Sequence, residues 1–443
     1  MERKIFRDFS AWKEAAADRK PLLLLGARQV GKTWAMREFG RRNYKHVAYV
    51  NCDTEPLAAE LFRTDYDIPR ILLALQAITG VPIEPGRTLI ILDELQEAPR
   101  GMHCLKYFAE NAPEHHVMAA GSLLGITLGR GESFPVGKVH TLHMFPLDFG
   151  EFLLAAGEEQ LYNLLQEQDW ETMRLLDIKY VEMLRRYYFV GGMPEADKTF
   201  FQHHDASKVR AVQRRILSDY RKDISKHTTA HESMRIGLVM NALPSQLAKE
   251  NKKFVYSALK KGARASEFEV AIQWLCDAGL VHRVSRVNEL RIPLKFYEDF
   301  NAFKLFFLDC GLLACLSNAP AAQMLIGDSV FTEFKGAFTE QYVLQQMVAN
   351  NIAPFYWSKA NSSAEVDFIV QDEASIVPIE VKAEANVRSR SLAEVVKANA
   401  SQPMKAVRFS MQDYIVQDWM KNIPLYGVSA YLQTLSATPP TLF

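Results

Sequence analysis

The chain has 443 residues, in which 52 Lys and Arg residues balance 52 Asp and Glu residues. This length exceeds that of one ordinary domain and indicates roughly two to four domains. A hydrophobic fraction of 48% and a charged fraction of 23% are typical of a folded globular protein and exclude a disordered chain. The neutral net charge leaves nucleic-acid binding open, because a basic patch can lie within a neutral total.

Cysteine usage and hydropathy indicate the compartment. The five cysteines are scattered and form no C-x-x-C motif, which favours a reducing compartment over a disulfide framework. The start of the chain, Met1–Phe9, is charged and lacks the apolar stretch of a signal peptide. The longest apolar runs, Leu22–Leu25 and Phe303–Leu308, are much shorter than a membrane span. We therefore expect a cytoplasmic protein without membrane contact.

Along the chain, four stretches differ in their residue pattern. Residues 1–155 alternate short apolar runs with helical segments, which is typical of a parallel α/β sheet. Residues 156–235 indicate a helical, increasingly basic lid or linker. Residues 236–318 indicate short helices and a hairpin, and residues 319–443 indicate a helix followed by strands. The predicted strands of the first stretch are Pro21–Leu25, His46–Asn51, Thr88–Leu92 and His116–Ala120.

A phosphate-binding motif follows the first predicted strand. The segment reads G-x-x-x-x-G-K-T between an apolar strand and the helical segment Trp34–Phe39. In such a loop, backbone N–H groups and the helix N-terminus face phosphate. Lys32 is expected to pair with the β- and γ-phosphates, and Thr33 to offer its hydroxyl to Mg²⁺. The predicted nucleotide-binding residues are Gly26, Ala27, Arg28, Gln29, Val30, Gly31, Lys32, Thr33 and Asp93.

Two adjacent acids end the third predicted strand. Carboxylates that close an apolar strand need a cation to receive them. Asp93 fits the acid on the magnesium side, and Glu94 fits the base that polarises the attacking water, with a solvated strand end as the alternative for Glu94. Ser122 follows the fourth strand, where it either senses the γ-phosphate or caps a helix. The expected ligands are ATP and Mg²⁺.

Several motifs together resemble a prokaryotic AAA-type ATPase family. Its motifs are G-P-R-Q-V-G-K-T, D-E-I-Q and P-L-x-F-x-E-F, with Ala27 and Leu95 as departures in this chain. The segments that carry the resemblance are Gly26–Thr33, Leu92–Gln96, Ala120–Ser122 and Met144–Phe152.

The resemblance implies the order of the domains and the choice of base. A helical region with a G-G-x-P element follows the ATPase in this family, and Gly191–Pro194 matches that element. A C-terminal domain of unknown function comes next. Adenine is implied as the base, and no guanine-reading N-K-x-D motif is present. An arginine finger from Arg130, from another arginine or from a neighbouring subunit stays open, and so does an oligomer.

The third stretch contains a segment that fits a winged helix. Helices are predicted at Asn251–Lys260 and Ala265–Cys276, followed by a hairpin of Gly279–Ser285 and Glu289–Phe296. Residues 249–264 contain six bases and one acid, and a second basic stretch lies upstream. These stretches either contact the phosphate backbone of DNA or RNA or are solvated helix faces.

Two strand-like segments near the C-terminus carry opposed carboxylates. If Asp372–Ser375 is a four-residue hairpin loop, Gln371 lies opposite Ile376 and Asp367 lies opposite Glu380. Like charges in opposed positions destabilise a sheet. The pattern therefore favours a divalent cation that both carboxylates share.

Asp367 followed by Glu380-x-Lys382 resembles the signature of restriction-endonuclease-like nucleases. Those domains usually begin with a helix that carries another acid. Glu340 lies on the apolar face of such a helix, and Glu333 is its substitute. The resemblance implies that Glu340, Asp367 and Glu380 bind Mg²⁺, while Lys382 orients or activates the attacking water.

The predicted fold is α/β: a P-loop AAA-type ATPase domain, a helical region with a winged-helix-like segment, and a C-terminal α/β restriction-endonuclease-like domain. The expected function is ATP hydrolysis coupled to a nuclease-like domain that binds or cleaves nucleic acid with Mg²⁺. The alternative is an ATP-operated switch whose C-terminal domain is a non-catalytic partner-recognition module.

Overall fold

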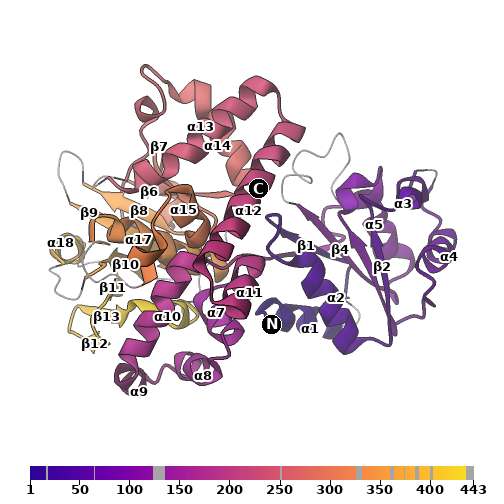
Figure 1. The fold of residues 1–443 in the computed structure, drawn as a ribbon, viewed down its shortest axis with the longest axis horizontal. Helices are drawn as coiled ribbons and strands as arrows, with labels where there is room; N and C mark the ends of the chain where they lie inside the picture. Colours follow the sequence, from indigo (N-terminus) through magenta and orange to yellow (C-terminus); the bar gives the residue numbers. More distant parts are fainter. Residues whose placement is uncertain are drawn as a thin grey trace. The chain divides into compact units, whose positions relative to one another are not determined.

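The chain forms two compact units in a computed structural model (Figure 1). One unit comprises residues 1–145 with 277–279, and the other comprises residues 146–276 with 280–443. The structure describes residues 1–15, 18–63, 65–122, 135–249, 252–325, 332–359, 364–373, 375–384, 389–399 and 403–435. The finer division into four domains stays a prediction.

The first unit contains a five-stranded sheet in the order β2-β3-β4-β1-β5, and all neighbouring strands are parallel. The predicted parallel α/β sheet is therefore confirmed. Its strands are β1 (Leu22–Gly26), β2 (His46–Asn51), β3 (Thr88–Asp93), β4 (His116–Ser122) and β5 (His140–His143). The helices are α1 (Ile5–Glu14), α2 (Lys32–Asn43), α3 (Pro56–Leu61), α4 (Ile68–Thr79) and α5 (Gly101–Asn111).

Helices cover both faces of this sheet, as expected for parallel strands with apolar side chains on each side. On one face, Leu23, Ile90 and Val117 pack with residues of α3, α4 and α5. On the other face, α2 packs against β1 to β4, and Phe9 of α1 contacts Phe39 of α2 with ring centroids 5.3 Å apart. Because the strands are parallel, the carboxyl ends of β1, β3 and β4 meet at one edge, where ligands bind in open α/β sheets.

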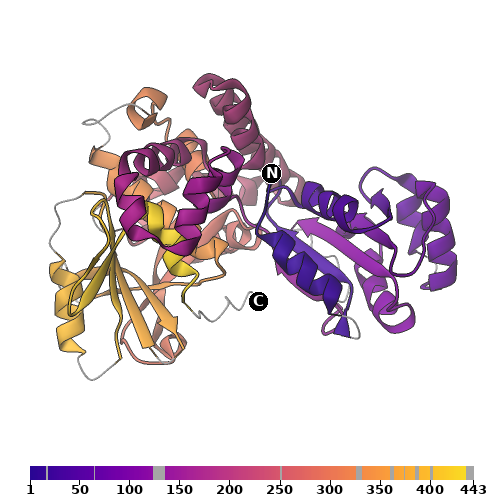
Figure 2. The same ribbon diagram turned by 90° about the horizontal axis from the view of Figure 1, so that it is seen from below.

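The second unit is built around a mixed eight-stranded sheet in the order β12-β13-β11-β10-β9-β8-β6-β7. Most of its strands lie side by side in the orange and yellow part of Figure 2. The strands are β6 (Val281–Val287), β7 (Glu298–Phe307), β8 (Phe355–Ser358), β9 (Glu365–Asp372), β10 (Ser375–Val381), β11 (Ala406–Ser410), β12 (Ile415–Val416) and β13 (Met420–Pro424).

Helices make up the rest of the second unit, and α17 packs against β7, β10, α15 and α19. The helices are α7 (Phe149–Ala155), α8 (Glu159–Glu167), α9 (Trp170–Leu175), α10 (Asp177–Val190), α11 (Pro194–His203), α12 (Ala206–His227), α13 (Ala230–Leu247), α14 (Ala265–Asp277), α15 (Cys310–Leu316), α16 (Ala321–Leu325), α17 (Thr332–Ala349), α18 (Arg390–Ala398) and α19 (Val428–Leu432).

The hairpin predicted in residues 279–296 has a different second strand. β6 pairs antiparallel with β7, whereas Glu289–Phe296 lies in the connection between them. Pro293 follows a cis peptide bond in this connection, and a proline there has no N–H to donate to a ladder. β6 also pairs with β8, so the hairpin continues the large sheet. The winged-helix prediction is not confirmed.

One of the two helices predicted for the winged helix is present. Ala265–Cys276 is confirmed as α14. The helix predicted at Asn251–Lys260 is wrong over the described residues 252–260, which contain a short 3₁₀ turn. The physical reason is a tertiary contact: the Phe254 N–H donates to the Phe303 carbonyl of β7 at 2.8 Å, and the two rings stack.

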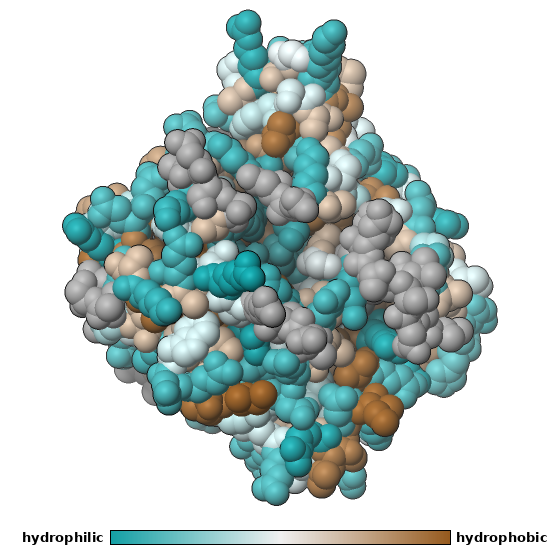
Figure 3. Space-filling model, turned by 90° about the vertical axis from the view of Figure 1, so that its left-hand side faces the viewer, coloured by the Kyte–Doolittle hydropathy of each residue, from teal (hydrophilic) through white to brown (hydrophobic). Residues whose placement is uncertain are grey.

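Hydropathy shows no membrane-spanning element in the described part of the chain. None of its helices is both long enough and apolar enough to cross a bilayer. The face seen in Figure 3 is mostly hydrophilic, with apolar side chains in small, separate patches. Scattered apolar residues of this kind are normal on a protein surface.

Candidate active site

The loop between β1 and α2 wraps around the side chain of Lys32. The Lys32 Nζ donates hydrogen bonds to the carbonyl oxygens of Gly26 and Ala27, both at 2.9 Å. Gly31 has a φ of 97°, which glycine adopts without strain. A Cβ on Gly26 would lie 2.3 Å from the Met144 carbonyl oxygen. The glycines of the motif are therefore required by the path of the backbone.

Lys32 is a buried cation at the N-terminal end of α2. Burial lowers the pKa of its ammonium to about 8, although Glu94 and Asp93 act in the opposite direction. An anion at the loop would stabilise the charged form, since an opposite charge nearby favours ionisation. A helix N-terminus adds N–H donors and a positive dipole end. This arrangement suits phosphate.

Asp93 ends β3 beside the first turn of α2. The Thr33 Oγ1 donates a hydrogen bond to Asp93 Oδ2 at 2.7 Å. The Glu94 N–H donates to the other oxygen, Oδ1, at 3.2 Å. A hydroxyl and a carboxylate oxygen side by side are the oxygen donors that Mg²⁺ prefers. The residues present therefore fit a magnesium ion held on the side of Thr33 and Asp93.

Glu94 adopts a backbone conformation that is unusual outside glycine. Its φ and ψ are 50° and 42°, in the left-handed region. The Gln96 Nε2 donates to Glu94 Oε2 at 2.6 Å. Residues held in sparsely populated conformations cluster at functional sites. Gln96 therefore holds the Glu94 carboxylate, and the two-residue spacing of Glu94 and Gln96 in the D-E-x-Q motif is the sequence signal for this contact.

Arg3 and Tyr49 also support this site, although no motif in the sequence indicates either residue. The Arg3 guanidinium is buried and donates to the Val30 carbonyl at 3.0 Å and to the Phe145 carbonyl at 2.7 Å. The Tyr49 hydroxyl donates to Asp93 Oδ2 at 3.0 Å. Both contacts join residues far apart in the sequence, so no local motif announces them.

Two residues of the predicted ATPase chemistry are only partly placed. Ser122 is the last residue of β4, and its backbone pairs in register with Gly26 of β1. Its side chain lies outside the described residues, as does Arg130. The roles of both residues stay predictions.

The predicted hairpin of the C-terminal carboxylates is present as β9 and β10. Gln371 lies opposite Ile376 and Phe368 opposite Ile379, as predicted. The ladder ends at this second pair, so Asp367 and Glu380 are the next residues along the two strands. The loop is shorter than predicted, because Asp372 and Ser375 are themselves paired.

Lysine side chains lie among these carboxylates. Glu340 of α17 is buried and forms an ion pair with Lys252. The fully buried Lys304 of β7 reaches Glu365 of β9 at 2.5 Å and Glu340 at 3.9 Å. Burial opposes ionisation of Glu340, but Lys252 and Lys304 together hold the pKa of this carboxyl below its usual value. We call Lys252, Lys304, Glu340 and Glu365 the lysine–carboxylate cluster.

Asp367 and Glu380 lie next to this cluster. Desolvation and then the charge of Glu340 raise the pKa of Asp367 to about 7. The Val381 N–H donates to Asp367 Oδ2 at 2.8 Å, and Lys382 Nζ lies 3.0 Å from Glu380 Oε1. Within the described residues, no three histidine, cysteine or acidic side chains form a group able to hold a metal ion. The side chain of Glu333 lies outside those residues.

Comparisons with known protein families match three successive parts of the chain. Residues 18–153 match the family described as AAA domain. Residues 181–323 and 335–432 match two families described as domains of unknown function, DUF8612 and DUF4143. A comparison with curated proteins gives no match.

Among solved structures, the chain is similar to a Walker-type ATPase of Pyrococcus abyssi. The identity is 14%, the match covers 71% of this chain and 95% of that chain, and the TM-score is 0.44. A similarity at this level carries no argument by itself. The match of residues 18–153 to the AAA domain family and the geometry of the phosphate-binding loop both support a P-loop ATPase domain of the AAA type in this part of the chain.

Proposed function

We propose that the chain binds ATP with Mg²⁺ in its first unit and hydrolyses the terminal phosphate. The observation that carries this proposal is the 2.7 Å contact between the Thr33 hydroxyl and the Asp93 carboxylate, next to the buried ammonium of Lys32. In P-loop ATPases this set of groups binds the β- and γ-phosphates with magnesium.

Each residue has a separate task in the hydrolysis. Lys32 and the loop N–H groups bind the phosphates, and Thr33 and Asp93 hold the magnesium ion. When bound, the ion neutralises charge on the phosphate oxygens. Glu94 accepts a proton from the water that attacks the γ-phosphorus, and the bond to the ADP oxygen breaks. Ser122 is the proposed sensor of the γ-phosphate.

The test is ATP turnover by the purified chain and a matched pair of lysine variants. Lys32→Ala should abolish both hydrolysis and tight nucleotide binding, because it removes the cation that faces phosphate. Lys106→Ala, in α5, should leave both unchanged. Turnover that persists in Lys32→Ala would contradict the assignment of the site.

For the C-terminal part, we propose a non-catalytic module that recognises a partner in response to nucleotide. The supporting observation is that ammonium groups already compensate the carboxylates. Lys304 lies between Glu340 and Glu365, and Lys252 pairs with Glu340. Because these charges are nearly balanced, a divalent cation would gain less electrostatic free energy here than at an acidic site without lysines.

A metal-dependent nuclease is the second candidate, and a specific observation favours it. Asp367 and Glu380 lie directly beyond the last paired residues of β9 and β10, and Lys382 Nζ lies 3.0 Å from Glu380 Oε1. These are the residue types that the nuclease resemblance requires. The Oε2 atoms of Glu340 and Glu380 are buried and have no hydrogen-bond partner among the described residues. In this candidate, Glu340, Asp367 and Glu380 hold Mg²⁺ and Lys382 orients the attacking water.

Cleavage of labelled single- and double-stranded DNA and RNA distinguishes the two candidates. The assay contains Mg²⁺ or Mn²⁺, with and without ATP, and compares wild type with Asp367→Ala. Asp372→Ala, on the same strand but paired with Lys405, is the control. The recognition module predicts no cleavage by any of the three proteins. Cleavage that only Asp367→Ala loses would establish the nuclease and overturn the module.

A further inference from the structure

Asp93 is held by a third donor that belongs to neither the phosphate-binding loop nor the acidic motif. The Tyr49 hydroxyl donates to Asp93 Oδ2 at 3.0 Å, and Thr33 donates to the same oxygen at 2.7 Å. The Glu94 N–H donates to Oδ1 at 3.2 Å. Three donors on two oxygens fix the rotation of the carboxylate group, which neither Thr33 nor Glu94 could do alone.

The position of Tyr49 follows from the order of the strands. β2 lies next to β3, with Asn51 beside Asp93 and Tyr49 beside Ile91. Residues two apart on a strand share a face, so Tyr49 and Asn51 lie on the same side of β2. The Tyr49 hydroxyl thus reaches Asp93 from the neighbouring strand.

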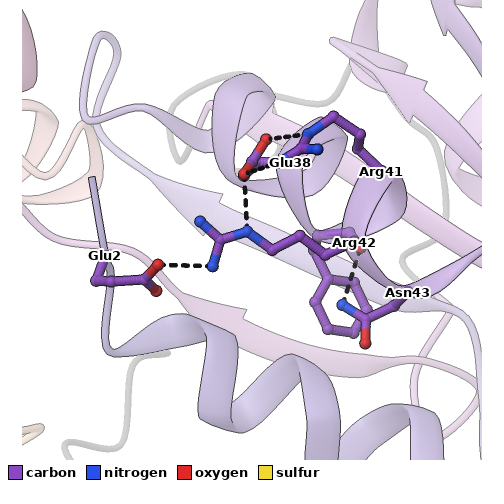
Figure 4. A network of polar contacts seen from close by, with 6 residues as sticks. Glu2, Glu38, Arg41, Arg42 and Asn43 are labelled. Carbon is purple, nitrogen blue, oxygen red and sulfur yellow. Dashed lines mark hydrogen bonds and ion pairs between the residues drawn. The ribbon is translucent and has the colours of Figure 1, made fainter.

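Arg37 holds the Tyr49 ring from the side of α2. Its guanidinium lies 4.7 Å from the ring centroid, a distance at which a cation is attracted to an aromatic face. The nearby acid Glu38 is bound by Arg41 and Arg42 (Figure 4). Because Arg41 and Arg42 neutralise Glu38, the Arg37 guanidinium is left to contact the Tyr49 ring.

A groove of about 710 Å³ gives solvent access to this arrangement. Its lining includes Thr33, Trp34 and Arg37 of α2, Tyr44 directly after α2, and Tyr49 of β2. The groove reaches the magnesium side of the nucleotide site through Thr33. Tyr49 thus connects an open surface to the carboxylate that faces the ion.

We infer that Tyr49 is a positioning residue of the nucleotide site, which keeps the Asp93 carboxylate turned toward Thr33 and the magnesium ion. The inference rests on the proposed binding of ATP with Mg²⁺. Tyr49 touches neither nucleotide nor metal in this role and acts through Asp93. Partners of this kind orient metal-binding side chains, and their loss typically lowers metal affinity or activity by about 10- to 100-fold.

Tyr49→Phe tests the inference because it removes the hydroxyl and keeps the ring beneath Arg37. The first measurement is binding of a fluorescent ADP analogue at increasing Mg²⁺ concentration. The half-saturating Mg²⁺ concentration should rise about tenfold. The second measurement is turnover, in which kcat should fall by about tenfold or more, while KM for ATP at saturating Mg²⁺ changes less than twofold.

Tyr44→Phe is the matched control. Tyr44 lines the same groove, but its hydroxyl lies 2.6 Å from His116 Nδ1 and not at Asp93. This variant should keep the Mg²⁺ dependence of wild type. A Tyr49→Phe variant with unchanged Mg²⁺ dependence would overturn the inference. If wild type binds the analogue with Mg²⁺ but hydrolyses no ATP, the hydrolysis proposal fails while the binding measurement still decides the role of Tyr49.

Discussion

At the scale of single residues, Asp93 and Glu94 are neighbours with different surroundings. Asp93 completes β3 and accepts hydrogen bonds from Thr33 and Tyr49. Glu94 turns into the left-handed region, and its carboxylate accepts from Gln96. The change of backbone conformation between the two residues gives the two acids different partners, as the proposed roles of Asp93 at the magnesium ion and Glu94 at the attacking water require.

Glu94→Gln should therefore separate binding from hydrolysis. The amide keeps the size of the side chain but cannot accept a proton, and a general base typically contributes about 10²- to 10⁴-fold to the rate. We expect kcat to fall by at least about 10²-fold, with ATP affinity within a few-fold of wild type. Single-turnover hydrolysis and equilibrium binding measure the two quantities. Loss of binding together with turnover would contradict the separate roles.

His116 gives the first unit a predictable sensitivity to acid. Burial and then the charges of Arg19 and Lys13 lower the pKa of this histidine from 6.5 to about 4. Its ring lies against Trp12 and Tyr44. The folded state favours the neutral form of His116. Its contribution to the free energy of unfolding is therefore fully present above pH 6.5 and is lost as the pH falls toward 4.

The expected loss from this one group is on the order of 3 kcal/mol of unfolding free energy between those pH values. In His116→Gln this contribution is absent. Thermal unfolding at several pH values should show wild type losing its advantage over the variant as the pH falls below 6.5. Parallel pH profiles for the two proteins would contradict the proposed cause.

The sequence predicts the local part of this site and misses the tertiary part. Motif spacing and strand ends predict that Lys32, Thr33 and Asp93 lie at one edge of a parallel sheet, and the structure brings Thr33 and Asp93 into contact there. Tyr49 is separated from Asp93 by 44 positions, and Arg3 from Val30 by 27. Such partners depend on which strands become neighbours and on side-chain packing, which residue spacing does not specify.

At the scale of elements, two motifs of the family resemblance have a structural role. In the segment Pro146–Phe152, Asp148 begins α7 with a reciprocal cap to Glu151 and accepts from Ser429 at 3.0 Å. In the G-G-x-P element, the Gly192 N–H donates to Asp309 Oδ2 at 2.6 Å, and the Leu147 N–H donates to the Gly192 carbonyl at 2.7 Å. These motifs join α7, α10 and α15.

Gly192→Ala tests this junction. A Cβ at residue 192 would lie 2.1 Å from the Leu147 carbonyl oxygen, so backbone must move. We expect loss of several kcal/mol of stability or failure to fold. Gly237→Ala in α13 is the control, because its Cβ meets no atom within 4 Å and alanine stabilises a helix interior by about 0.5–1 kcal/mol. Thermal unfolding compares the two, and equal midpoints would contradict the steric argument.

The residue pattern predicts the bounds of strands that end at charged or turn residues, but it does not predict which strands pair with β6. The alternation of residues identified β9 and β10 together with their register. It did not identify the partner of β6 on each side, because β7 begins after a ten-residue connection and β8 lies far along the chain. Tertiary pairing also overrode the helical pattern at residues 252–260.

At the scale of the whole molecule, the two candidate sites lie in different units. The proposed nucleotide site lies in residues 1–145, and the lysine–carboxylate cluster lies in the second unit. The units are compact by themselves, so we expect two thermal transitions. A ligand that binds only one folded unit raises only the transition of that unit.

Addition of ADP with Mg²⁺ at about 100 times its dissociation constant should stabilise the first unit by about 2.7 kcal/mol. The corresponding midpoint should rise by roughly 5–10 °C. The transition of the second unit should stay within about 1 °C, and Lys32→Ala should show no shift at all. Calorimetry resolves both transitions. A shift of both midpoints in wild type would contradict the independence of the units.

The shared sheet has a consequence for how this protein can change during evolution. β6 and β7 belong to the stretch matched as DUF8612, and β8 to β13 belong to the stretch matched as DUF4143. β6 pairs with β8. A protein that had only one of the two stretches would therefore expose the unpaired edge of β6 or β8, and exposed strand edges promote aggregation. The two stretches should therefore be inherited as one piece.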